Sequence, residues 1–324
     1  MHRLYFIIGC TASGKGSLGR ELARRLGGQI VSVDSMKIYR RMDIGTAKCS
    51  PAIRAEIPHH CIDIVEPSES FSVAQFVQHA DRAVERIAAA GSVALAVGGT
   101  SLYIKALSEG LFDGPSTDEQ TRQHLRARAA ATEGLAALHA ELAGVDPEAA
   151  ARIHPNDERR IVRALEVYHA TGTPITTLQR QWDSGQRRYE AVFIGLRRDK
   201  ADQGRRINLR AKMMLDAGLA DEVAALLAEP GGLSGQAAQA VGYAEMIDYL
   251  KGLCSLDEAF EQIKINTRRL AKKQRTWHRR FAGVTWFDAA PDETPEALAA
   301  RVMQTLSNDE PACRQAGTDE RSPT

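Results

Sequence analysis

The sequence is poor in cysteine and contains no long apolar run. Its cysteines are odd in number, scattered and without a C-x-x-C pair, which argues against a disulfide framework and against a zinc site. They are Cys10, Cys49, Cys61, Cys254 and Cys313. No apolar run approaches the length of a membrane-spanning helix. The residues that open the chain read as a core strand rather than a signal peptide, so we expect a cytoplasmic protein with no membrane partner.

An excess of one charge is also absent, because the formal net charge of the 324 residues is +1. The local distribution differs: residues 268–280 carry seven basic side chains and no acidic one. A basic stripe is most often a solvated face, but Trp277 and His278 are interleaved in this one. That pattern favours an anionic partner. The overall composition, 44% hydrophobic and 26% charged, is typical of a globular chain with one large or two modest domains.

The first motif is the loop Gly9–Ser17, with the sequence GCTASGKGS. It follows the apolar run Leu4–Ile8 and precedes Leu18–Leu26, where apolar residues recur at helical spacing. This order predicts a phosphate-binding loop of the nucleotide- and ATP-binding type, in which backbone N–H groups, the helix start and Lys15 face the anion. The alternative is a glycine-rich turn with a chance lysine. The predicted contacts are Gly9, Cys10, Thr11, Ala12, Ser13, Gly14, Lys15, Gly16 and Ser17.

The residue after Lys15 departs from the usual phosphate-loop pattern. That position normally holds a Ser or Thr whose hydroxyl meets Mg²⁺, but here it is Gly16. Ser17 follows, and Lys-Gly-Ser is close to the Lys-Gly-Thr of nucleotide kinases. We therefore expect Mg²⁺ as the cofactor, with Ser17 as its protein ligand either directly or through water.

Two further predicted strands end in polar residues. Residues 29–33 lead into Asp34, and residues 93–97 lead into Gly98–Thr100. Ligands of parallel sheets bind beyond the carboxyl ends of the strands, so both segments are expected near the phosphate loop. Each has a structural alternative: Asp34 or the serine after it can cap a helix at Met36–Tyr39, and the Gly-Gly-Thr segment can be an ordinary turn.

Residues 113–187 contain only predicted helices. An all-helical block inside an alternating β/α chain is typical of an inserted lid or substrate domain. Its arginines are most simply a solvated face, but the tight group Arg159, Arg160 and Arg163 can contact a nucleic-acid backbone. The expected helices span 118–131, 134–142, 147–153 and 157–170.

The sheet is predicted to resume after this block. Residues 205–227 read as one long helix that carries Arg206 and Arg210 on one face. Residues 305–324 are polar, and we expect a disordered tail there. The other expected elements are strands at 189–196 and 284–287 and a helix at 256–281.

These elements predict an α/β protein with a P-loop NTPase-like parallel sheet flanked by helices and an all-helical insertion domain. The catalytic core is expected at 1–112 and 188–304, and the inserted lid or substrate domain at 113–187. The residues alone fit either phosphoryl transfer or a reaction with pyrophosphate as leaving group, because the loop stabilises whichever oxygen takes on charge. We expect a monomer, since no predicted helix has an unexplained apolar face.

Several segments together resemble the tRNA dimethylallyltransferase family, whose members modify the adenosine just 3′ of the anticodon. The resemblance runs in order from about Phe6 to Trp286, nearly the whole chain. The segments are GCTASGKGS, SVDSMKIYRRMDIGTAK, LAVGGTSLYIKAL, RIHPNDERRIVRALEVYHATG, the turn Val241-Gly242-Tyr243 and TRRLAKKQRTWHRR.

The resemblance implies transfer of a dimethylallyl group from dimethylallyl diphosphate to N6 of the adenosine at tRNA position 37, in tRNAs that read codons beginning with U. Diphosphate leaves and N6-isopentenyladenosine forms. Asp34 is implied as the base that takes the N6 proton. Lys15, Arg210 and Mg²⁺ would neutralise the departing diphosphate, and Thr100 would hydrogen-bond within the site. The adenine must be flipped out of the anticodon loop to react.

The implied partner is the anticodon stem-loop of tRNA, and the resemblance makes the insertion at 113–187 a tRNA-binding lid. The positions that match the family's tRNA-facing residues, together with the basic helix, are Asp34, Ser35, Met36, Lys37, Thr100, Arg122, Arg159, Arg160, Arg163, Arg268, Lys272 and Arg275.

The chain departs from the family pattern at a few positions. Cys10 stands where the family usually has Pro, and Gly16 where it has Thr or Ser. Gln239 and Ala244 replace basic residues around the Val241-Gly242-Tyr243 turn, which weakens one expected tRNA contact. Two other functions remain as alternatives: a P-loop small-molecule or nucleotide kinase, and a non-catalytic tRNA-binding paralogue.

Overall fold

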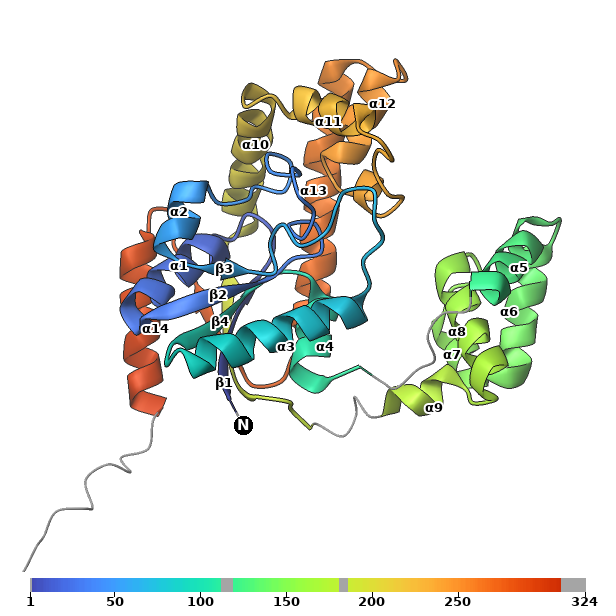
Figure 1. Ribbon diagram of the computed structural model, residues 1–324, viewed down its shortest axis with the longest axis horizontal. Helices are drawn as coiled ribbons and strands as arrows, with labels where there is room; N and C mark the ends of the chain where they lie inside the picture. The colour runs from blue at the N-terminus through green and yellow to red at the C-terminus, as the bar shows by residue number, and fades with distance from the viewer. Residues whose placement is uncertain (1, 112–118, 181–185, 310–324) are drawn as a thin grey trace, which may run out of the picture. The chain divides into compact units, whose positions relative to one another are not determined.

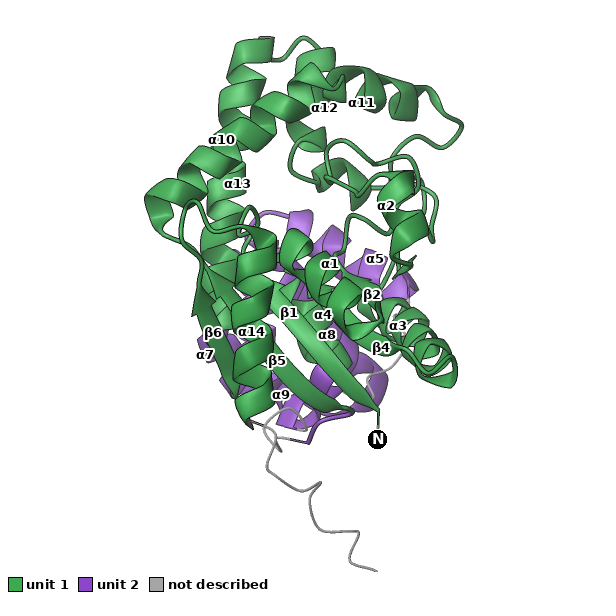
Figure 2. Cartoon of the chain, turned by 90° about the vertical axis from the view of Figure 1, so that its left-hand side faces the viewer, with its two compact units in different colours: residues 1–107, 189–324 green, residues 108–188 purple. Residues whose placement is uncertain are grey.

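The computed structural model describes residues 2–111, 119–180 and 186–309. The chain divides into two compact units (Figure 2). Unit 1 consists of Met1–Leu107 and Tyr189–Thr324, and unit 2 of Ser108–Arg188. The insertion domain predicted at 113–187 lies within the bounds of unit 2. Each unit is described by itself below.

Unit 1 is built on one six-stranded sheet whose neighbouring strands are all parallel, in the order β3-β2-β4-β1-β5-β6 (Figure 1). This confirms the predicted α/β class. Because parallel strands place their carboxyl ends at one edge, loops that are far apart in sequence meet there. The strands are β1 (Arg3–Gly9), β2 (Gly28–Val33), β3 (His59–His60), β4 (Val93–Gly98), β5 (Glu190–Arg197) and β6 (Val284–Asp288).

Helices cover both faces of the sheet. On one face, α1 (Lys15–Leu26) and α14 (Pro295–Asp309) pack over residues such as Ile7, Leu95 and Ile194, all almost fully buried. On the other face lie α3 (Val73–Ala89) and α4 (Ser101–Glu109), where the rings of Phe76 and Tyr103 stack. Each fully buried leucine or isoleucine contributes about 1.5–3 kcal/mol, so the sheet is a rigid support for the loops at its edge.

Four helices of unit 1 pack against one another beyond the carboxyl edge of the sheet, and the last of them runs back along the sheet to contact β1 (Figure 1). The prediction of a single long helix at 205–227 is wrong. The segment forms two helices, which are separated at Gly218, whose φ of 88° is left-handed. A helix cannot continue through that conformation. The group consists of α10 (Lys200–Asp216), α11 (Leu219–Ala228), α12 (Tyr243–Leu250) and α13 (Leu256–His278).

The regular elements among the described residues of unit 2 are all helices, as predicted, and the unit has a core of its own. Leu125, Leu138, Leu142, Ile161 and Leu165 are fully buried within it. A short helix that the pattern did not predict, α9, adds Ile175 to this core. Its helices beyond the end of α4 are α5 (Glu119–Ala130), α6 (Gly134–Val145), α7 (Pro147–Arg152), α8 (Glu158–Thr171) and α9 (Ile175–Gln179).

The remaining elements of unit 1 are α2 (Pro51–Glu56) and the short 3-10 helix η2 (Ala237–Gln239). The tail predicted to begin at residue 305 does not begin there, because α14 continues to Asp309. Residues 310–324, including Cys313, lie outside the described residues. Among the described helices, none is long and apolar enough to cross a membrane.

Candidate active site

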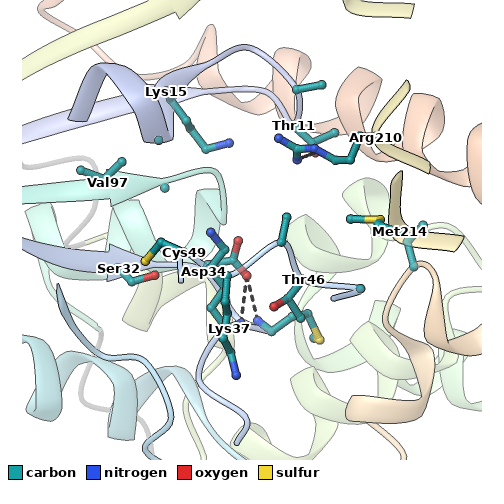
Figure 3. A pocket seen from close by; sticks show the side chains of 18 of the residues that line it. Thr11, Lys15, Ser32, Asp34, Lys37, Thr46, Cys49, Val97, Arg210 and Met214 are labelled. Atoms are coloured by element: carbon teal, nitrogen blue, oxygen red, sulfur yellow. Dashed lines mark hydrogen bonds between the residues drawn. The ribbon is translucent and has the colours of Figure 1, made fainter. Parts of the chain in front are cut away.

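A cavity of about 480 Å³ lies in unit 1 at the carboxyl edge of the sheet (Figure 3). The predicted phosphate-binding loop at residues 9–17 contributes to its wall, as do the segment after β2 and helices α10 and α13. Thr11, Lys15 and Arg210 occupy one side, and Asp34 and Lys37 the opposite side. The cavity therefore brings together side chains that the sequence analysis selected from three separate segments.

The loop from residue 9 to residue 17, hereafter the cradle, has the geometry its sequence predicts. Gly14 adopts a φ of 96° and caps α1, a backbone conformation that favours glycine. The N–H of Ser13 donates to the carbonyl of Cys10 at 3.2 Å, and Lys15 Nζ donates to that same carbonyl at 3.2 Å. The first turn of α1 thus opens toward the cavity with a lysine beside it, an arrangement that binds anions.

Distant residues hold the cradle in place. The Thr11 N–H donates to Gln274 Oε1 at 2.7 Å, and Gln274 Nε2 donates to the Gly99 carbonyl at 3.0 Å. Gln203 Nε2 donates to the Thr11 carbonyl at 2.8 Å. Neither glutamine was given a role from the sequence alone. The spacing of Ala271, Gln274 and the buried His278 on α13 marks an inward-facing stripe that indicates Gln274.

Asp34 combines the two roles that the sequence left open. Its Oδ1 accepts the N–H groups of Met36 at 2.9 Å and of Lys37 at 3.3 Å, as a capping side chain does. The segment that follows is a run of turns rather than a helix, and the carboxylate still lines the cavity. Local hydrogen bonds therefore fix the direction in which this acid points.

Thr100 lies beside Asp34 but not on the cavity wall. Its Oγ1 accepts the N–H of Ser35 at 3.1 Å, and its own N–H donates to the Val33 carbonyl at 3.3 Å. Gly98, two residues earlier, does line the cavity. The hydroxyl thus joins the turn after β4 to the turn after β2, and its predicted contact with substrate stays a prediction.

Positive charge dominates the cavity. Burial, with the nearby Arg210 guanidinium, lowers the pKa of Lys15 from 10.5 to about 8. Burial likewise lowers the pKa of Lys37 and that of Arg210, while Asp34 opposes the shift in all three groups. Among the described residues that line the cavity, Asp34 is the one carboxylate. Such a site gains by binding a multiply charged anion.

The wall formed by residues 43–50, hereafter the acid-side loop, is held by a residue that the sequence analysis missed. Glu222 on α11 accepts the backbone N–H groups of Asp43, Ile44 and Gly45 at 3.0, 2.8 and 3.3 Å. The hydroxyl of Tyr243 donates to the same carboxylate at 2.5 Å. No local pattern links Glu222 to this loop, since the two lie far apart in sequence.

Tyr243 itself is fully buried and packs against Gly45. A Cβ at Gly45 would stand 2.4 Å from the Tyr243 ring, so only glycine fits. The Val241-Gly242-Tyr243 turn, compared with a tRNA contact in the sequence analysis, therefore uses its tyrosine to support the acid-side loop. Val241 lines the cavity directly.

The donor atoms at the cradle do not fit a resident Mg²⁺. Gly16 has no hydroxyl, and Ser17 Oγ accepts a hydrogen bond from Arg20 Nη2 at 3.2 Å. The described residues contain no cluster of three His, Cys, Asp or Glu side chains that could hold a metal ion. Ser17 as a Mg²⁺ ligand stays a prediction, and no step below passes through a metal.

The arginines proposed for tRNA in unit 2 are partly organised by one buried acid. Glu166 accepts from Arg122 Nε at 2.6 Å and from Arg163 Nη1 at 3.3 Å. Arg159 and Arg160 are exposed at the start of α8, where Arg160 pairs with Asp157 at 3.3 Å. Arg122 and Arg163 thus contact the same carboxylate, and Glu166 neutralises part of their positive charge.

The basic stripe on α13 is less uniform than its sequence suggests. Lys272 is exposed, and Arg268 Nη2 donates to Asn208 at 2.6 Å. Arg275 is turned inward, where it donates to Gln203 at 2.5 Å behind the cradle. His278 is 1% exposed rather than part of the surface, and burial lowers its pKa to about 4.

Comparison with known proteins gives a consistent result. The family model described as IPP transferase matches residues 37–281. A tRNA dimethylallyltransferase of Geobacillus thermodenitrificans is 47% identical over 306 residues, covering 93% of this chain and 94% of that protein. Another, from Geobacillus kaustophilus, is 48% identical over 286 residues, which cover 87% of this chain and 89% of the relative.

Solved structures show the same likeness. The tRNA isopentenylpyrophosphate transferase of Bacillus halodurans superposes with a TM-score of 0.68 at 41% identity, covering 95% of this chain and 98% of that one. A eukaryotic dimethylallyltransferase captured acting on tRNA gives a TM-score of 0.80 at 25% identity, with 95% and 79% coverage.

Proposed function

This chain belongs to the IPP transferase family, and from that premise we propose that it transfers a dimethylallyl group from dimethylallyl diphosphate to N6 of the adenosine 3′ to the tRNA anticodon. It is accordingly a tRNA-modifying prenyltransferase. The observation that carries the proposal is a single carboxylate, Asp34, facing a cationic cradle across one cavity.

Asp34 acts as the general base in this proposal. The exocyclic amine of adenine is a poor nucleophile because its lone pair is delocalised into the ring, so its proton must leave as the new bond forms. The N6–C1 bond forms while the C1–O bond of the donor breaks. The oxygen keeps the electron pair and departs with diphosphate, and the N6 proton passes to the Asp34 carboxylate.

The cradle stabilises the leaving group. Lys15, Arg210 and the N–H groups at the start of α1 face the position where negative charge grows, and preorganised donors of this kind lower the barrier strongly. A bound diphosphate also returns the lowered pKa of Lys15 toward its ordinary value, because the anion favours the charged amine.

Apolar side chains support a hydrocarbon substrate rather than a sugar. Ile207, Met214, Val241, Ile263 and Leu270 line the same cavity and come from α10, from the segment before α12 and from α13. They offer dispersion contacts to a five-carbon allyl group and no hydrogen-bond partner for a ribose. This supports dimethylallyl diphosphate over a nucleoside triphosphate as the occupant.

The tRNA is proposed to present its anticodon stem-loop to the cationic residues of both units. The target adenine must leave the stack to reach Asp34, as in other enzymes that modify a base. The proposed phosphate contacts are Arg122, Arg159, Arg160, Arg163, Arg268, Lys272 and Arg275, with Asp34–Lys37 and Thr100 near the flipped base. Position 37 and a preference for codons beginning with U stay predictions.

Three further properties remain proposals. We propose that the enzyme acts in the cytoplasm, where its tRNA substrate is made, and that it acts as a monomer. Mg²⁺ remains a proposed cofactor, which the phosphate oxygens of the donor rather than the cradle would hold.

One assay tests the proposed function. The protein is incubated with labelled dimethylallyl diphosphate and unmodified tRNA, and the digested tRNA is examined for the prenylated nucleoside. The proposal expects label in N6-isopentenyladenosine from the position next to the anticodon. ATP turnover without tRNA dependence would indicate a kinase instead. Salt-sensitive tRNA binding without product under any prenyl donor would indicate a non-catalytic binding protein.

A further inference from the structure

An arginine of α1 stands next to the cradle position that lacks a hydroxyl. A Cβ added at Gly16 would lie 3.6 Å from Arg20 Nη1, so the guanidinium covers the space above this glycine. Arg20 Nη2 donates to Ser17 Oγ at 3.2 Å. The guanidinium one helical turn later therefore lies within van der Waals reach of a side chain at position 16.

The Arg20 guanidinium is available to a ligand. It lines the cavity with Lys15 and Asp34, and it is only partly buried. Its one hydrogen bond within the described residues is the contact with Ser17, and no carboxylate there lies within ion-pair distance of it. Its charge also reaches the far wall, where it helps to lower the pKa of His59 and that of Lys37 after burial.

We propose that Arg20 binds the diphosphate of the donor and takes over part of the charge neutralisation that a P-loop hydroxyl normally assigns to Mg²⁺. This inference rests on the proposed function for the identity of the donor. A guanidinium suits the task, because its planar set of N–H donors matches two phosphate oxygens and it stays charged at every physiological pH.

The proposal explains why Ser17 does not restore the metal site. A hydroxyl that accepts from a guanidinium lies beside a full positive charge, and that charge repels a divalent cation from the same oxygen. When the C1–O bond breaks, the electron pair moves onto the diphosphate, in a cavity that both Lys15 and Arg20 line. The chain therefore needs less Mg²⁺ at this step than a chain with the usual motif.

The test measures the affinity for inorganic pyrophosphate by calorimetry in the presence of EDTA, without tRNA or prenyl donor. Arg20→Gln and Arg20→Lys are compared with Arg24→Gln, which alters an exposed arginine one turn further along α1 that does not line the cavity. Because charge-assisted hydrogen bonds are strong, we expect Arg20→Gln to weaken binding about tenfold or more. Arg20→Lys should lose less, and Arg24→Gln should stay within about twofold of the unmodified chain.

A second measurement uses the Mg²⁺ dependence of single-turnover transfer. Arg20→Gln should raise the stimulation by Mg²⁺, and the double change Gly16→Thr with Arg20→Gln should raise it further, since it rebuilds the usual hydroxyl. Metal-free pyrophosphate affinity equal in Arg20→Gln and the unmodified chain would overturn the proposal. The pyrophosphate titration uses neither a prenyl donor nor tRNA. Its result therefore tests the role of Arg20 even if the transfer assay shows that the proposed function is wrong.

Discussion

The cradle and the acid-side loop face the same cavity but are built in different ways. The cradle takes its turn from its own residues, because Gly14 turns the chain and the Cys10 carbonyl accepts two hydrogen bonds, and Gln274 and Gln203 then anchor its backbone at Thr11. The acid-side loop also has internal hydrogen bonds, to the carbonyls of Asp43 and Ile44, but the N–H groups of residues 43–45 all donate to a distant side chain. Glu222 and Tyr243, from helices much later in the chain, hold its backbone.

The two walls therefore have different tasks: the cradle provides charge, and the wall opposite to it provides position. The cradle supplies positive charge through Lys15 and the start of α1. The opposite wall must place one base, Asp34, against an incoming adenine, and distant anchors fix the backbone of the loop beside it. Substitutions in the cradle should therefore alter donor binding, while substitutions behind the acid-side loop should alter transfer with little effect on the donor.

The largest effect is expected at Asp34, which local contacts alone orient. Asp34→Asn keeps an oxygen that can accept from Met36 and Lys37 but removes the base. Single-turnover transfer should fall about 10²–10⁴-fold, the usual contribution of general base catalysis. The affinity for tRNA, measured by filter binding, should change little. Asp34→Glu is the matched variant; Asp34→Asn with near-normal transfer would remove the acid from the mechanism.

The next effect tests the distant anchor. Glu222→Gln leaves at least one N–H of residues 43–45 without an acceptor, which costs about 1–3 kcal/mol. We expect a roughly tenfold or greater loss of transfer. Hydrogen exchange should quicken at residues 43–50 but not in the cradle.

Asp221→Asn, at the exposed neighbour of Glu222 on α11, serves as the control for this change. Unchanged exchange at residues 43–50 in Glu222→Gln would show that the loop holds its shape without the carboxylate. The contrast between the two walls would then be lost.

A smaller effect concerns the cradle and pH. Lys15, with a pKa of about 8 in the free protein, loses its charge as the pH rises, so anion binding above that value requires proton uptake. Pyrophosphate affinity should fall about fivefold from pH 8 to about pH 9. Lys15→Arg should abolish this step, because arginine stays charged. The pyrophosphate ion titrates equally in both proteins, so equal pH profiles would contradict the lowered pKa.

The smallest effect is expected at Tyr243. Tyr243→Phe removes one hydrogen bond to Glu222 and keeps the ring against Gly45. The free energy of unfolding should drop by about 1 kcal/mol, and transfer should stay within about threefold. Urea denaturation and the transfer assay measure both quantities. A loss of transfer as large as that of Glu222→Gln would mean that the carboxylate acts through the tyrosine rather than through the backbone.

The same contrast explains how much of the molecule the sequence could predict. The cradle, five of the six strands and the helices expected at 118–131, 134–142, 147–153, 157–170 and 256–281 follow from local spacing, and the structure agrees with them to within a few residues. The prediction of one helix at 205–227 was wrong because the apolar residues keep a helical period across Gly218, as Leu215, Leu219, Val223 and Leu226 show. The glycine was visible in the sequence, but nothing local showed that its φ would be positive.

The candidate site was predicted where one motif carries the chemistry and missed where contact is distant. Lys15, Asp34 and Arg210 reach one cavity, as expected. Glu222 and Gln274 escaped notice because an ordinary acid and amide on amphipathic helices acquire their roles only from the tertiary fold. Thr100 was placed near the right turn, but its hydroxyl bonds to backbone rather than facing the cavity.

The central claim is that the cradle holds a prenyl diphosphate opposite Asp34 rather than a nucleoside triphosphate. The most direct measurement is equilibrium dialysis of labelled dimethylallyl diphosphate against the protein, with ATP added as competitor. The account predicts that the prenyl diphosphate binds and that an equal concentration of ATP fails to displace it. Displacement by ATP, accompanied by its turnover, would contradict the account.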